Sequence, residues 1–179
     1  MLDTLFKKRL SDEVLAKYFV NGILNTIEQG FNEIKSFLEE DPAFVTPPDL
    51  KDARNGHFAM IVIAGNIGEL SNTFSPSQQK SLMPVIFNML ADSLGMEEKD
   101  FKELYNDYAA FMKRVNYPSK VTLYSMSKGM FHKYGLNEYQ ENYFKSLNTP
   151  NPLFIKRMDE IMKNFLWNWD AFFKRYKVY

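Results

Sequence analysis

The sequence contains no cysteine among its 179 residues. This absence excludes disulfide bonds, cysteine-ligated zinc, iron–sulfur clusters and cysteine nucleophiles together. It is also typical of proteins that stay in a reducing compartment, so we predict a cytoplasmic location.

The chain also has no net charge, because 22 basic residues balance 22 acidic ones. Nucleic-acid binding normally requires a concentrated excess of lysine and arginine, so no nucleic-acid partner is expected. The pair Gly65 and Gly68 lacks the spacing and the lysine of a phosphate-binding loop. Neither His57 nor His132 has a partner at metal-binding spacing. We therefore expect no metal and no cofactor.

Long apolar runs are missing as well. The longest, Phe58 to Gly65, is far short of the roughly 20 residues that a membrane-spanning helix needs. The N-terminal residues MLDTLFKKRLSDEV have acids on both sides of their basic cluster and no apolar core, so we predict no signal peptide. No segment is expected to span a membrane.

Bulky apolar side chains, in contrast, are abundant. Residues of the hydrophobic class make up 45% of the chain, with 16 Phe, 10 Tyr and 10 Met. Such a chain is long enough to bury one substantial core. We predict one all-α domain over residues 1–179, a helical bundle of about seven helices with an aromatic core.

The first long helix is expected to begin at Ser11, which can cap it, after a short helix over Asp3 to Arg9. Its apolar stripe changes face along the sequence, so Asn21-Gly22 is predicted to be a kink or a change of packing partner. It ends in Glu39-Glu40-Asp41, where the helix dipole disfavours negative charge. A basic surface or a hard cation would compensate, but solvation of an exposed end suffices.

Ser75-Pro76-Ser77-Gln78 is the clearest local signal, with a serine cap, a proline at the first helical position and glutamine at the capping-box position. The helix that it starts is expected to stop at Gly95. Pro84 lies inside this helix and is predicted to kink or divide it.

A central apolar helix is expected at about residues 49–70, with Asp49 as its cap. The run from His57 to Gly65 also has the composition of a buried strand, but no second strand is available to pair with it. Because Phe58 to Ala64 is apolar nearly all round, we expect other helices to cover it on several sides.

The last element is predicted to be one long amphipathic helix at about residues 152–177. At about 100° per residue, one arc of roughly 140° holds Phe154, Ile155, Met158, Ile161, Met162, Phe165, Leu166, Trp169, Phe172, Phe173 and Tyr176. Trp167 lies on the opposite, polar face. An exposed tryptophan among charged residues is typical of a protein-contact site.

Four residues of the central helix region form a candidate ligand site. His57 and Arg54 lie beside the small residues Ala64 and Gly68, which leave space for an anionic or flat ligand. The alternative is close packing of another helix against the small residues, with His57 hydrogen-bonded at the margin.

Three functional hypotheses follow. The leading one is a non-enzymatic interaction or regulatory module that contacts another protein or a second copy of this chain through Trp167. The second is a bundle that binds an apolar or flat anionic small molecule near His57 and Arg54. The third, ranked lowest, is an enzyme of unrecognised type that uses His57, Arg54, Asn66 and Glu69.

Overall fold

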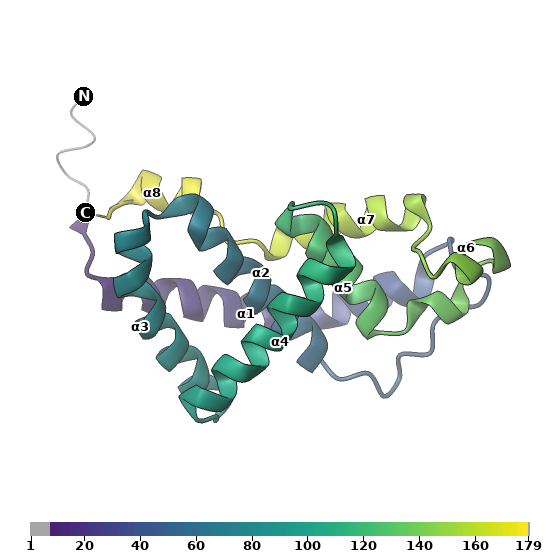
Figure 1. The fold of residues 1–179 in the computed structure, drawn as a ribbon, viewed down its shortest axis with the longest axis horizontal. Helices are drawn as coiled ribbons and strands as arrows, with labels where there is room; N and C mark the ends of the chain where they lie inside the picture. The colour runs from purple at the N-terminus through teal and green to yellow at the C-terminus, as the bar shows by residue number, and fades with distance from the viewer. Residues whose placement is uncertain (1–7, 179) are drawn as a thin grey trace.

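The computed structural model describes residues 8–178, which form an all-α bundle (Figure 1). The first half of the chain contains α1 (Asp12–Glu40), α2 (Gly56–Thr73) and α3 (Pro76–Leu94). The second half contains α4 (Glu98–Asn116), α5 (Thr122–Lys133), α6 (Asn142–Leu147), α7 (Pro152–Met162) and α8 (Trp169–Arg175). There are also two 3₁₀ helices: Leu136–Tyr139 lies between α5 and α6, and Lys163–Phe165 lies between α7 and α8. The all-α prediction is confirmed.

Helix α1 runs along the length of the molecule, with α3 and α8 near one end and α6 at the other (Figure 1). Helix α2 packs against α1, α3, α4 and α5, and its residues 60–67 are all buried. The central position predicted for this apolar helix is therefore confirmed. The core is aromatic, as expected, and its largest fully buried side chains include Phe19, Phe58, Phe101, Phe131 and Phe154.

None of the helices between residues 8 and 178 has the length and apolar character needed to cross a membrane. The prediction of a cytoplasmic location stays a prediction.

The N-terminal segment differs from the expected short helix where it is described. Lys8–Arg9 forms the two-residue strand β1, parallel to β2 (Tyr176–Lys177) near the C-terminus. The first seven residues, on which the expectations of a helix and of no signal peptide mostly rest, lie outside the described residues. The short strand pair ties the start of α1 to the end of the chain, and the Leu10 N–H extends it by donating to the Lys177 carbonyl.

The sequence predicts a kink or a change of packing partner at Asn21-Gly22. Helix α1 is continuous through these two residues, so the helix does not break there. Gly22 instead permits a close approach. A Cβ atom at this position would overlap the six-membered ring of Trp167. The glycine that suggested a kink therefore makes room for an indole from the other end of the chain.

Helix α3 has the predicted ends. Ser75 and Gln78 form the capping box, and Gly95 takes the left-handed conformation at the C-cap. The helix continues through Pro84, so this proline does not divide it.

Helix α2 begins at Gly56, later than the predicted start at about residue 49. The Asp49 carboxylate accepts a hydrogen bond from the Lys51 N–H in a turn and does not cap a helix. The start of α2 is held by Tyr134 of the chain segment after α5. The Tyr134 hydroxyl accepts from the Phe58 N–H at 3.1 Å and donates to the Arg54 carbonyl at 2.9 Å.

The acidic end of α1 is compensated from within the chain. The Asp41 side chain has no exposed surface, and Arg157 of α7 donates to both of its carboxylate oxygens, at 2.6 and 2.7 Å. Pairing with Asp41 raises the pKa of the Arg157 guanidinium. Solvation of an exposed end was therefore the wrong expectation for Asp41.

The prediction of one long C-terminal helix is wrong. Helix α7 ends at Met162, and after the 3₁₀ turn the backbone becomes extended at Leu166, with φ −86° and ψ 131°. Helix α8 then begins at Trp169, capped by the Asn168 side chain, which accepts from the Ala171 N–H.

Asn66 of α2 stabilises this break through the backbone on both sides of Leu166. Its side-chain amide donates to the Phe165 carbonyl at 2.8 Å, and its side-chain oxygen accepts from the Trp167 N–H at 2.7 Å. A continuous helix would use these two backbone groups internally, so the buried asparagine favours the extended conformation. The apolar stripe predicted for residues 152–177 nevertheless faces the core, where six of its side chains are buried: Phe154, Met158, Met162, Phe165, Trp169 and Phe172.

Candidate functional site

Trp167 does not lie on an exposed polar face. Because the helix breaks before it, its indole turns toward α1, packs against the core and is half-buried. The ring centroids of Trp167 and Phe19 are 6.0 Å apart in an edge-on arrangement. The predicted exposed contact residue is thus a packed residue, and its orientation is corrected accordingly.

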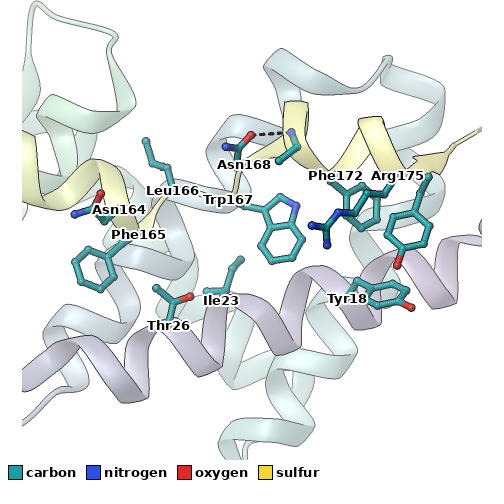
Figure 2. A pocket seen from close by; sticks show the side chains of 12 residues that line it. Tyr18, Ile23, Thr26, Asn164, Phe165, Leu166, Trp167, Asn168, Phe172 and Arg175 are labelled. Atoms are coloured by element: carbon teal, nitrogen blue, oxygen red, sulfur yellow. Dashed lines mark hydrogen bonds between the residues drawn. The ribbon is translucent and has the colours of Figure 1, made fainter. Parts of the chain in front are cut away.

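A groove of about 390 Å³ lies between α1 and the broken C-terminal segment. Figure 2 shows Tyr18, Ile23 and Thr26 of α1 on one side of it and residues 164–175 on the other, with the Trp167 indole between them. We call it the Trp167 groove. The Phe172 ring centroid lies 5.9 Å from that of Trp167 and 6.1 Å from that of Tyr18, so the walls of the groove are largely aromatic.

A second pocket, of about 430 Å³, contains two of the predicted ligand residues, Ala64 and Gly68. We call it the Gly68 pocket. Its other lining residues come from α4, the loop after α4 and the start of α5: Tyr105, Ala109, Met112, Lys113, Asn116, Tyr117, Pro118, Ser119, Lys120, Thr122 and Ser125, with Gly65 of α2. The pocket is mainly apolar and carries a few polar groups at its margin, as is usual for small-molecule sites.

The two glycines of this pocket have different surroundings. A Cβ atom at Gly65 would lie 2.5 Å from the Met126 sulfur, so a neighbouring helix fills that side of α2. A Cβ atom at Gly68 would meet no atom within 4 Å. Close helix packing therefore explains Gly65, and open space lies in front of Gly68.

Both charged residues that line the Gly68 pocket are lysines, Lys113 and Lys120. Neither forms an ion pair with any residue between positions 8 and 178. The buried Asn116 side chain holds the adjoining loop by donating to the carbonyls of Ser119 and Val121 at 3.3 and 3.0 Å. The pocket thus presents positive charge at the margin of an apolar space.

His57 and Arg54 lie in a separate, open hollow of about 530 Å³ and do not line the Gly68 pocket. The expected single site of four residues is therefore divided in two. His57 Nδ1 is 2.6 Å from the Tyr108 hydroxyl oxygen, and its ring meets Tyr134 edge-on, with the two centroids 5.6 Å apart. The alternative prediction, a histidine hydrogen-bonded at the margin, describes His57 well.

The ionisable groups around His57 are shifted toward their neutral forms. Burial, followed by the positive charge of Lys133, lowers the pKa of His57. Burial raises the pKa of Tyr134 to about 12 and also raises the pKa of Tyr108. On α5, burial and then the positive charge of Lys128 lower the pKa of His132, which is half-buried.

These shifts predict that stability falls with pH below neutrality. Above about pH 7 both histidines are neutral in the folded and unfolded states, but as pH falls through about 6.5 the unfolded chain binds more protons. The free energy of unfolding, measured by urea denaturation between pH 7.5 and 5.5, is therefore expected to decrease. The decrease should be smaller in the double variant His57→Gln/His132→Gln. An equal decrease in both proteins would contradict the lowered pKa values.

Two of the four residues of the enzyme hypothesis, Asn66 and Glu69, do not line the hollow that contains His57 and Arg54. The Asn66 amide donates to the carbonyls of Val62 and Phe165, while its oxygen holds the Trp167 N–H, so the side chain is structural. Glu69 accepts a hydrogen bond from the Asn72 side chain and does not line the His57 hollow. No group of three or more histidine and carboxylate residues suited to a metal ion occurs in the described part of the chain.

Sequence reasoning missed Lys113, Lys120 and Arg175 as site residues. The lysines are separated in sequence from Gly68 by more than 40 positions. Arg175 looked like an ordinary basic residue at a helix C-terminus. These charges line a pocket only because α4 and the loop after it pack beside α2, and α8 packs beside α1.

Comparison with known proteins gives no further guide. No protein-family model, no curated protein and no solved structure matches the chain.

Proposed function

We propose that this protein is a non-enzymatic helical binder of a small apolar molecule that carries an acidic group, such as a medium-chain alkyl carboxylate. The Gly68 pocket is the proposed site. The observation that carries the proposal is the open apolar space before Gly68, whose charged lining residues are both cations.

The size and chemistry of the pocket support this ligand class. Its volume of about 430 Å³ falls within the range of roughly 300–1,000 Å³ that is usual for small-molecule sites. Ala64, Ala109 and Met112 offer apolar surface to an alkyl chain, and burial of each methylene group contributes about 0.8 kcal/mol. Lys113 and Lys120 suit the carboxylate, whose charge favours the pocket margin over the apolar interior.

The geometry favours this function over the interaction module that relied on Trp167. That hypothesis required an exposed indole on a polar helix face, whereas Trp167 packs against Gly22 and Phe19. Binding of a protein partner or of a second copy stays a prediction, but Trp167 no longer supports it as an exposed contact residue.

Titration calorimetry with sodium decanoate tests the proposal, because decanoate has the alkyl chain and the single negative charge. Gly68→Phe is expected to weaken binding at least ten-fold, since its ring would extend from α2 into the space in which a Cβ atom meets no atom within 4 Å. Gly68→Ala is the matched control and is expected to keep the affinity within about three-fold, because a methyl group occupies little of the pocket.

A comparison of decanoate with uncharged 1-decanol tests whether Lys113 and Lys120 bind the carboxylate. Lys113→Gln/Lys120→Gln is expected to weaken decanoate binding about five-fold and to leave 1-decanol binding unchanged, because only decanoate is charged. Lys80→Gln removes an exposed lysine of α3 that does not line the pocket and serves as control. Undiminished decanoate binding by Gly68→Phe, or no binding to the unmodified protein at about 1 mM, would refute the proposal.

A further inference from the structure

The Trp167 groove is lined by aromatic rings from two distant parts of the chain. Tyr18 comes from α1, while Trp167 and Phe172 come from the segment after the helix break. Tyr18 keeps 45% of its surface exposed, although its ring contacts Phe172 and Tyr176. The groove of about 390 Å³ therefore offers the Trp167 indole and the exposed part of the Tyr18 ring as aromatic surface.

Among residues 8–178, Arg175 is the sole charged residue that lines this groove. It is exposed at the last position of α8 and forms no ion pair with a residue in the range 8–178. Figure 2 shows its side chain pointing from α8 toward the Trp167 indole. Its planar guanidinium can stack on aromatic surfaces and pair with a carboxylate through two parallel hydrogen bonds.

The indole of Trp167 has a feature that core packing does not explain. Its N–H is buried and has no hydrogen-bond partner among the described residues. Leaving a buried donor unpaired is unfavourable, and a phenylalanine ring would avoid it. Compared with phenylalanine, tryptophan provides a wider aromatic face. One part of this ring packs against Gly22, and the ring also lines the groove.

We infer that the Trp167 groove is a second binding site, separate from the Gly68 pocket, for a planar aromatic molecule with a carboxylate. The ring of the ligand lies against the Trp167 indole and the exposed part of the Tyr18 ring, and Arg175 binds the carboxylate. The two sites share no lining residue, so this inference is independent of the proposed alkyl carboxylate site.

The probe is 2-naphthoate, compared with uncharged 2-naphthylmethanol in calorimetric titrations of the full chain. Arg175→Gln is expected to weaken 2-naphthoate binding about ten-fold and to change 2-naphthylmethanol binding less than two-fold. Lys174→Gln is the matched control, because Lys174 is the neighbouring exposed cation on α8 and does not line the groove. It is expected to leave both affinities within two-fold.

Two further variants locate the bound probe. Tyr18→Ala is expected to weaken both naphthyl ligands about five-fold or more, because it removes one stacking surface. Gly68→Phe is expected to leave both unchanged. The inference is overturned if 2-naphthoate does not bind, if Arg175→Gln and Lys174→Gln have equal effects, or if Gly68→Phe abolishes binding. The last result would place the aromatic probe in the Gly68 pocket.

Discussion

Asn66→Leu is expected to lower the free energy of unfolding by about 2–4 kcal/mol. Leucine has a similar volume but cannot donate to the Phe165 carbonyl or accept from the Trp167 N–H. Both backbone groups would then lack their partner beside a buried helix. Because natural domains are stable by about 5–15 kcal/mol in total, the loss is a large fraction of the whole.

Urea denaturation measures this effect as a midpoint lower by about 1–2 M. Asn72→Ala is the control on the same helix, because Asn72 is exposed and its side chain donates only to Glu69. Its expected change is within about 0.5 kcal/mol. A loss below about 1 kcal/mol for Asn66→Leu would mean that other contacts set the break in the C-terminal segment.

Arg157→Met is expected to be comparably destabilising, by about 2–4 kcal/mol. The variant leaves the Asp41 carboxylate, which has no exposed surface, without its cation, while methionine keeps most of the apolar stem. We place the loss below the upper end for buried ion pairs because the Arg157 side chain is 39% exposed and water reaches part of the site.

A double-mutant cycle separates this ion pair from general packing. Asp41→Asn/Arg157→Met removes the stranded charge, so it is expected to be more stable than Arg157→Met alone by about 1 kcal/mol or more. Denaturation midpoints of the four proteins give the coupling. Strict additivity of the two substitutions would contradict a direct stabilising interaction between Asp41 and Arg157.

The parts of the fold that the sequence predicts are those set by local chemistry. The capping box at Ser75 and the stop at Gly95 each involve neighbouring residues only. The apolar stripe of residues 152–177 also contains the side chains that are buried there, Phe154, Met158, Met162, Phe165, Trp169 and Phe172, although it places Trp167 on the wrong side.

The incorrect predictions depend on distant partners. The C-terminal helix breaks because Asn66, about 100 positions earlier, competes for its backbone groups, and because Gly22 admits the Trp167 ring. The start of α2 is similarly set by Tyr134. No local pattern reveals such partners, since the helical propensity of each segment taken alone is unchanged.

The candidate site was predicted in part for the same reason. Small residues at Ala64 and Gly68 indicate space on one face of α2, and a pocket lies there. Which polar groups line that space depends on the neighbouring segment, and α4 and the loop after it supply Lys113 and Lys120 where His57 and Arg54 were expected.

A decanoate titration followed in ¹H–¹⁵N correlation spectra tests the proposed function most directly, because it locates the ligand residue by residue. Binding in the Gly68 pocket is expected to give saturable shifts centred on the backbone amides of Ala64, Gly68 and Lys113, with the Trp167 indole N–H unmoved. Shifts centred on the Trp167 groove, or no saturable shift at all, would contradict it.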